Sequence, residues 1–270
     1  MILDDTFLNA YTYGFCEKRG FTRGTAWRWS LRELVRTTGC NAIILPVCAW
    51  QDHTYSTQID SRGPDVMDAA DVHAVSEYAR ELDLKLILKA MVNCRDGYWR
   101  AYIHFFDRPV PVEPGWEDWF ASWNEHVCRV ADMAEQSHAD MLCIGCEMVG
   151  TDHREQEWRR LVDRVRQHYH GPVTYNCDKY QEDRVVWWDA LEIISSSGYY
   201  PMGRWTTTLS ASSGSRRRRT DPSCSWNAAA LRESRASTGP MTGRMAENAA
   251  RRNRRNGMTH SYERLNAFPL

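Results

Sequence analysis

Ala139-Asp-Met-Leu-Cys-Ile-Gly-Cys-Glu147 is an apolar run that ends on a carboxylate. If the run is a strand, regular alternation places Met141, Cys143, Gly145 and Glu147 on one face. Leu142, Ile144 and Cys146 then lie on the other face. Barrel enzymes present catalytic groups at the C-terminal tips of buried parallel strands. The run therefore predicts a buried strand that carries Glu147 at its tip.

Similar short apolar runs occur on both sides of this one and alternate with helical patterns. A β-then-α rhythm is typical of a parallel α/β domain. A complete barrel of eight units needs about 250 residues, so six units in about 200 residues predict an incomplete (β/α)8 TIM barrel. The six expected strands are residues 11–15, 42–47, 84–92, 139–147, 173–176 and 191–197.

Apolar residues spaced three and four apart predict the helices that follow three of these strands. We expect Thr151 or Asp152 to cap the third helix. The apolar stripes are Val72, Val75, Ala79 and Leu82 in the first helix, Trp116, Trp119, Phe120, Trp123 and Val127 in the second, and Trp158, Leu161, Val162, Val165 and Tyr169 in the third.

The composition changes after Trp205, which divides the chain into residues 1–205 and residues 206–270. The second part carries twelve Arg, no Lys and four acids, against 22 basic and 31 acidic residues in the first part. Neither a helical nor a strand period is present there, and apolar residues are too sparse for a strand buried on both faces. We expect strands seven and eight to be replaced by an irregular, poorly ordered tail.

The totals exclude several classes of protein. No apolar run reaches the length of a bilayer span, and the N-terminus lacks the pattern of a signal peptide. The nine Cys are an odd number scattered through strand-like and helix-like segments, which indicates reduced thiols. We therefore expect a soluble cytoplasmic protein without a membrane partner.

Five segments share a further likeness: Lys89-Ala-Met-Val-Asn93-Cys-Arg, Ile144-Gly-Cys-Glu147-Met, Trp158-Arg-Arg-Leu, Val173-Thr-Tyr-Asn-Cys-Asp-Lys-Tyr180 and Ile194-Ser-Ser-Ser-Gly-Tyr-Tyr-Pro201. As a set they resemble glycoside hydrolase family 113, the (β/α)8-barrel β-1,4-mannanases and their relatives. The resemblance covers about residues 11–205 and implies a retaining glycosidase with an acid/base Glu after strand four and a nucleophile Glu after strand seven. Glu147 occupies the strand-four position, preceded by Cys146 where many related glycosidases have Asn.

The strand-seven motif is missing from the tail, but the genetic code preserves a trace of one. Trp226 is always TGG and Asn227 always begins AA, so a frame that starts at the last G of TGG reads GAA, which encodes Glu. The same shift permits Ile-Leu-Phe-Met across Pro222-Ser-Cys-Ser225. We hypothesise that a frameshift between about Gly203 and Arg219 replaced the last two strands.

Glu147 has two interpretations, a catalytic acid/base and a strand-end carboxylate held in an ion pair with an Arg. Lys89 interrupts an apolar strand, and its amine must be paired or face the barrel mouth. Asp52 and Asp178 also follow strands, but neither occupies the nucleophile position. Candidates for sugar contacts are Lys89, Asn93, Asn176, Tyr199, Tyr200 and Trp205, with Trp50 and Trp99 weaker and core packing the alternative for each aromatic.

A metal or redox site is not expected. Cys143 and Cys146 match the C-x-x-C spacing, but on a regular strand one thiol faces the barrel and the other faces the helices. No second Cys/His pair has zinc-finger spacing, and the histidines at 104, 126, 153, 168 and 170 form no ligand pattern. We expect neither a metal nor a cofactor.

The best interpretation is a barrel glycosidase acting on a β-linked, mannan-like carbohydrate, with activity impaired by the damaged C-terminal quarter. One alternative is a carbohydrate-binding pseudoenzyme that keeps the cleft and lacks the nucleophile. A second is a nucleic-acid-associated protein that uses the Arg-rich tail. No aromatic residues interleave with the Arg runs and no recognition fold is visible, so we do not expect nucleic acid as a partner.

Overall fold

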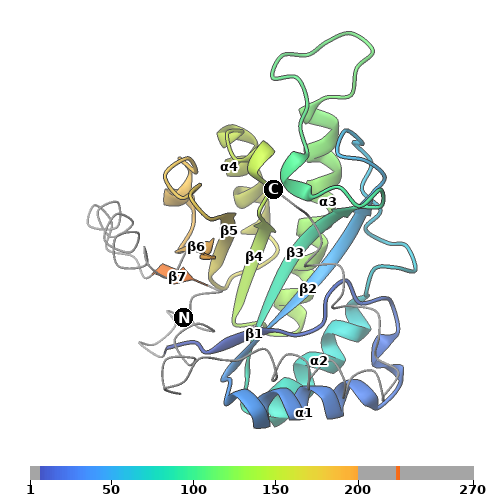
Figure 1. The fold of residues 1–270 in the computed structure, drawn as a ribbon, viewed down its shortest axis with the longest axis vertical. Helices are drawn as coiled ribbons and strands as arrows, with labels where there is room; N and C mark the ends of the chain where they lie inside the picture. Colours follow the sequence, from blue (N-terminus) through green and yellow to red (C-terminus); the bar gives the residue numbers. More distant parts are fainter. Residues whose placement is uncertain (1–6, 200–222, 226–270) are drawn as a thin grey trace, which may run out of the picture. The chain divides into compact units, whose positions relative to one another are not determined.

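The structure, a computed structural model, describes residues 7–199 and 223–225. Its centre is a sheet whose strands follow one another in sequence order, and every neighbouring pair is parallel (Figure 1). This arrangement confirms the predicted incomplete (β/α)8 barrel. The strands are β1 (Ala10–Thr12), β2 (Ala42–Gln51), β3 (Lys85–Cys94), β4 (Met141–Cys146), β5 (Val173–Asp178), β6 (Ile193–Ser197) and β7 (Ser223–Ser225).

An α-helix connects each pair of successive strands from the first to the fifth, and a short 3-10 turn lies in the connection from the fifth to the sixth. The three predicted stripes lie on α2, α3 and α4, and one further long helix, α1, joins β1 to β2. The helices are α1 (Ala26–Thr38), α2 (Ala69–Glu81), α3 (Trp116–Gln136) and α4 (Glu155–Val165), with short 3-10 turns η1 (Phe21–Arg23), η2 (Arg100–Tyr102), η3 (Val149–Thr151) and η4 (Trp188–Ala190).

The two faces of the sheet are buried by different partners. The face with Ile43, Leu45 and Val47 joins one large core that includes the apolar stripes of the helices. The opposite face forms a smaller cluster of strand residues, which includes Ile44, Ile87, Met141, Cys143 and Ile193. The described helices therefore cover one face, and the other face is the barrel interior.

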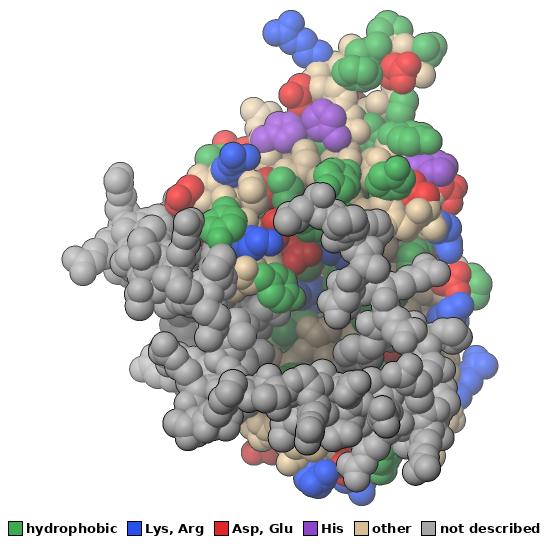
Figure 2. All heavy atoms as spheres, viewed as in Figure 1, with side chains coloured by type: hydrophobic (Ala, Val, Ile, Leu, Met, Phe, Trp, Pro, Cys, Tyr) green, Lys and Arg blue, Asp and Glu red, His purple; other side chains and the backbone are tan. Residues whose placement is uncertain are grey.

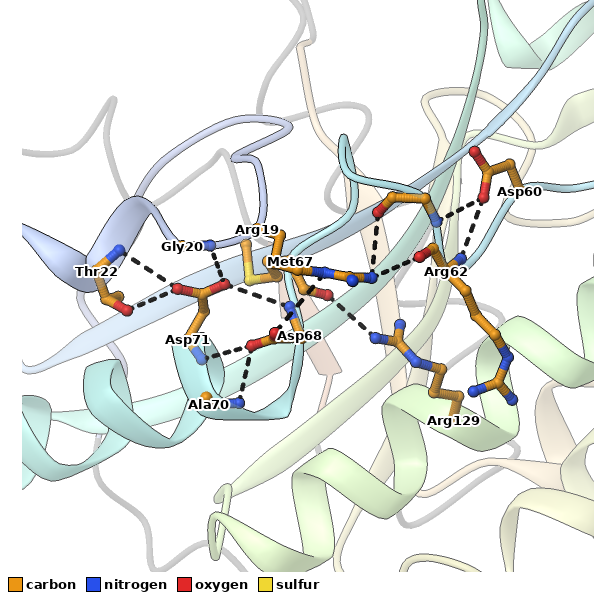
Figure 3. Close-up of polar contacts among 11 residues, drawn as sticks. Arg19, Gly20, Thr22, Asp60, Arg62, Met67, Asp68, Ala70, Asp71 and Arg129 are labelled. Carbon is orange, nitrogen blue, oxygen red and sulfur yellow. Dashed lines mark hydrogen bonds and ion pairs between the residues drawn. The ribbon is translucent and has the colours of Figure 1, made fainter.

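The start of α2 ties two loops of the barrel mouth together (Figure 3). Asp68 accepts hydrogen bonds from the first turn of α2, and Asp71 completes a capping box. The buried Asp71 carboxylate also accepts from the Gly20 N–H at 2.8 Å and the Thr22 hydroxyl at 2.6 Å. Burial opposes its charge, but the hydrogen bonds led by that of Thr22 outweigh burial and lower the pKa of Asp71.

Two details differ from the sequence-based expectations. The residue that caps α4 is Arg154 rather than Thr151 or Asp152, because Thr151 turns its hydroxyl to the Met148 carbonyl and Asp152 bonds to Tyr175. Within the segment expected to be irregular, β7 pairs with β6 and aligns Ser223 with Ile194. The remainder of the 206–270 segment lies outside the described residues.

In the described part of the chain, no helix combines the length and the apolar character that crossing a bilayer requires.

Candidate active site

Glu147 directly follows β4, and its backbone departs from a regular strand. The ladder between β4 and β5 shifts register between Cys143 and Cys146, which marks a bulge. Glu147 then adopts a φ of 53°, a left-handed conformation that is uncommon for a residue with a side chain. Its N–H donates to the Asn176 carbonyl at 2.7 Å. The bulge and the positive φ together set the direction of the Glu147 side chain.

The bulge also overturns the predicted orientation of the two thiols. Cys143 belongs to the cluster on the interior face that contains Ile44 and Ile87. Cys146 packs with Cys48 of β2 and Met91 of β3, whose side chains also point to the interior. Both thiols therefore face the barrel interior, because the extra residue of a bulge breaks the period of two. Among the described residues, no three His, Cys, Asp or Glu side chains form a group that could hold a metal ion.

A guanidinium holds the Glu147 carboxylate. Arg100, in η2 after β3, donates from Nη1 to Glu147 Oε2 at 3.2 Å, with side-chain exposures of 8% and 17%. Its Nη2 donates to Asn93 Oδ1 at 2.7 Å, and its Nε donates to the Val92 carbonyl at 3.1 Å. The structure therefore contains the ion pair with an Arg that was one of the two interpretations of Glu147. The partner was missed because one Arg in a loop carries no pattern.

A second polar group lies on the interior face beside Glu147. The buried Lys89 of β3 donates from Nζ to Asn176 Oδ1 at 2.9 Å, and Asn176 Nδ2 donates to Ser197 Oγ at 3.0 Å. Burial disfavours the ammonium, but the fields of Cys146, Cys143 and Glu147 outweigh it and raise the pKa of Lys89. Lys89 is thus paired inside the barrel, one of the two environments expected for it.

The charge of Glu147 acts on two further groups, Asp178 and Tyr199. The pKa of Asp178, at the end of β5, is raised by burial first, and the Glu147 charge adds to the shift. The pKa of Tyr199 is raised by the same two causes in the same order. Hydrogen bonds and an ion pair therefore bring Lys89, Asn93 and Asn176 together with Glu147 and Arg100, and Tyr199 lies two residues after the end of β6. Tyr200 and Trp205 lie outside the described residues.

The weaker candidates have other contacts. Trp50 stacks under the Arg95 guanidinium at 5.5 Å, and Asp52 pairs with the same Arg at 3.8 Å. Trp99 packs edge-on against Tyr102 with ring centroids 5.9 Å apart. These contacts give each side chain a structural role within the loops of the mouth.

The surface gives two further observations. Cavities of about 510 and 730 Å³ lie along α3 and α4, and the described residues lining them do not include Glu147. On the face shown in Figure 2, Lys and Arg side chains of the described residues are interspersed with Asp and Glu.

Comparisons with known proteins agree with this geometry. The model of Glycoside Hydrolase Family 113 matches residues 11–251. A solved complex of a GH113 β-1,4-mannanase is 40% identical with a TM-score of 0.79, and the match covers 80% of this chain and 70% of that one. The GH113 β-mannanase AaManA from Alicyclobacillus acidocaldarius is 34% identical with a TM-score of 0.77, covering 82% and 71%. A search of curated proteins finds no match. The chain therefore belongs to glycoside hydrolase family 113.

Proposed function

We propose that this chain is a retaining glycosidase domain for β-1,4-linked, mannan-like saccharides, with Glu147 as the general acid/base. The observation that carries the proposal is the position of Glu147, directly after β4 at the barrel mouth and partly open to solvent. Its neighbours are polar groups suited to sugar hydroxyls. The sugar itself is proposed from the two solved family members, which are β-mannanases.

The chemistry assigns a defined step to each group. A retaining glycosidase protonates the leaving oxygen with one carboxyl while a second carboxylate, about 5–5.5 Å away, attacks the anomeric carbon. In this proposal Glu147 protonates the leaving oxygen and later activates water. Asn93 and Asn176 bond to hydroxyls, Tyr199, Tyr200 and Trp205 stack on sugar rings, and Lys89 orients Asn176.

The proposal includes impaired turnover in the chain as written. The seventh strand position is occupied by Ser223–Ser225, and the next residue in the sequence is Trp226. This is the place where the hypothesised frame places Glu after an apolar run. The pairing of β7 with β6 supports the frameshift hypothesis, since the Glu encoded by the alternative frame would directly follow the last paired residue, Ser225. The family match, for its part, runs on through residue 251.

Manno-oligosaccharide assays test the proposal on two proteins, the chain as written and a version with the reading frame restored between residues 203 and 219. We expect the restored protein to release reducing ends and Glu147→Gln to lower that rate at least 100-fold. The matched control is Glu81→Gln, an exposed Glu at the end of α2. Unchanged turnover in Glu147→Gln contradicts the acid/base role, and equal activity of the two proteins contradicts the frameshift hypothesis.

A carbohydrate-binding pseudoenzyme is the second candidate, favoured by the Ser-Cys-Ser sequence in the strand-seven position. It predicts saturable binding of manno-oligosaccharide without turnover by the chain as written. The cytoplasmic location also stays a prediction. It is supported by the eight cysteines whose side chains the structure describes, which are free thiols.

A further inference from the structure

Two thiols lie in contact beside the Glu147 site. Cys16, in the connection after β1, places its Sγ 3.1 Å from the Sγ of Cys48 on β2. A disulfide bond requires about 2.05 Å between the sulfurs, so closure needs a movement of about 1 Å. Cys16 has a φ of 55°, a conformation that the surrounding contacts must stabilise.

The two thiols have different environments. Cys16 is partly exposed, and its pKa is lowered by the hydrogen bond with Cys48 and by the Arg100 charge, against the opposing effect of burial. Cys48 is 1% exposed, and its pKa is raised by the contact with Cys16 and by burial. A partly exposed thiol of lowered pKa next to a buried thiol is the arrangement in which one sulfur attacks and the other resolves.

A chain of hydrogen bonds joins this pair to Glu147. Asn93 Nδ2 donates to Cys16 Sγ at 2.8 Å, while Asn93 Oδ1 accepts from Arg100 Nη2 at 2.7 Å. Arg100 Nη1 in turn donates to Glu147 Oε2 at 3.2 Å. Asn93 therefore contacts both the Cys16 sulfur and the Arg100 guanidinium, which holds Glu147.

We propose that Cys16 and Cys48 form a reversible redox pair that small-molecule disulfides oxidise, and that its oxidation loosens Asn93 and Arg100 around Glu147. The Cys16 thiolate attacks one sulfur of the small disulfide and expels the other as a thiolate. Cys48 then loses its proton to solvent and attacks Cys16 in the mixed disulfide, which expels the second small thiolate. Two protein thiols are oxidised, and one small disulfide is reduced to two thiols.

Oxidation changes what Asn93 contacts. A disulfide sulfur is a weaker hydrogen-bond acceptor than the free Cys16 sulfur, and the shift toward Cys48 lengthens the Asn93–Cys16 contact. Arg100 then loses part of the support that fixes its orientation toward Glu147. The bond and the loosening are independent of the proposed function, whereas any effect on saccharide turnover rests on it.

The full chain in glutathione redox buffers, acid-quenched and alkylated before peptide mass spectrometry, tests the bond. In a buffer that is mostly glutathione disulfide, we expect at least half of the chain to carry a Cys16–Cys48 cross-link that dithiothreitol reverses. Cys48→Ala is expected to trap glutathione on Cys16. Cys128, partly exposed on α3 with its pKa raised by burial, is the control and should react more slowly. Equal labelling of Cys16 and Cys128 without a cross-link overturns the proposal.

Hydrogen exchange tests the coupling without any activity measurement. Peptides covering residues 93–102 and 147–152 should exchange at least threefold faster in the oxidised chain, and those of α4 should be unchanged. Cys16→Ser, checked for folding by thermal melting, has no thiol to oxidise at this position and should exchange at the same rate in oxidising and in reducing buffer. A cross-linked chain with unchanged exchange at 93–102 overturns the coupling. A chain that passes both tests but neither binds nor cleaves manno-oligosaccharide contradicts the proposed function alone.

Discussion

At the scale of single residues, Arg100 determines how Glu147 is held. One guanidinium donates to a carboxylate, a side-chain amide and a main-chain carbonyl. Its planar fork suits several acceptors at fixed angles, which an ammonium cannot match. Glu147 is therefore both an ion-pair partner and a group at the barrel mouth, and the two interpretations of it are compatible.

Replacing Arg100 by Met tests this arrangement. Arg100→Met keeps most of the side-chain volume but leaves three acceptors without their donor. We expect the free energy of unfolding to fall by about 2–4 kcal/mol, with Arg100→Lys intermediate. Denaturant titration measures the change. Glu147→Gln is the comparison, because its amide oxygen still accepts from Arg100, so it should cost less than about 1.5 kcal/mol. Equal losses of unfolding free energy in Arg100→Met and Glu147→Gln would contradict the conclusion that Arg100 stabilises all three acceptors.

At the scale of secondary structure, the bulge of β4 depends on a residue without a side chain. A Cβ added at Gly145 would lie 2.9 Å from the Tyr175 ring and 3.0 Å from Trp158. Both rings are fully buried and packed against each other. Gly145 thus lets the strand approach the helix layer just before the chain turns Glu147 toward Arg100.

Gly145→Ala should therefore destabilise the protein by about 1–3 kcal/mol, since neither ring can move freely. It should also reduce manno-oligosaccharide turnover in the frame-restored protein more than its stability loss explains, because the bulge positions Glu147. Gly24→Ala is the matched control, for nothing lies within 4 Å of the added Cβ there. Thermal melting of both variants gives the test, and a harmless Gly145→Ala would refute the packing argument.

Helix α2 offers a second test at this scale. Asp68 accepts from two N–H groups of the first turn, which otherwise have no helical partner. Asp68→Ala should cost about 1 kcal/mol. Glu81→Ala, at the exposed far end of the same helix, should cost less than about 0.5 kcal/mol. Urea titration of the two variants compares them directly, and equal costs would mean that the cap contributes nothing.

At the scale of the whole molecule, two buried groups give opposing dependences of stability on pH. Burial raises the pKa of Asp152 to about 7, while Tyr175 donates a hydrogen bond to it. Burial lowers the pKa of His126 to about 4, and one ring nitrogen lies 3.1 Å from the Val47 carbonyl. Burial thus keeps Asp152 neutral up to a pH of about 7 and keeps His126 neutral down to a pH of about 4.

The signs follow from proton linkage. The stabilisation from Asp152 is complete below its unfolded pKa of 3.8 and is lost as pH rises to about 7. The stabilisation from His126 is present above its ordinary pKa of 6.5 and is lost as pH falls to about 4. Because the two contributions change in opposite directions, the unfolding free energy of the native chain varies less with pH between about 4 and 7.

Asp152→Asn isolates one contribution, because Asn keeps an acceptor for Tyr175 and cannot titrate. The difference in unfolding free energy, native chain minus variant, should fall with rising pH by on the order of 4 kcal/mol between pH 4 and 7. The His126 contribution is common to both proteins and cancels. Urea midpoints across this range measure the difference, and a constant difference would show that Asp152 does not titrate there.

The amino-acid sequence by itself determined the strand-and-helix rhythm, the parallel fold class and the placement of Glu147 at the end of the fourth strand. Local patterns suffice for these features, because apolar periodicity depends on which face of an element is buried. All six expected strands are present, with bounds that differ by a few residues. The family resemblance was visible for the same reason, since four of its five motifs lie on or just after strands and the fifth, which begins at Trp158, lies in α4.

Only the tertiary structure decided which groups meet at the mouth. Arg100 reaches Glu147 across 47 positions of sequence, and Cys16 meets Cys48 across 32. The inward direction of Cys146 depends on a bulge that a period of two cannot express. Contacts of this kind arise from the curling of the sheet and the packing of its loops, and no local pattern encodes them.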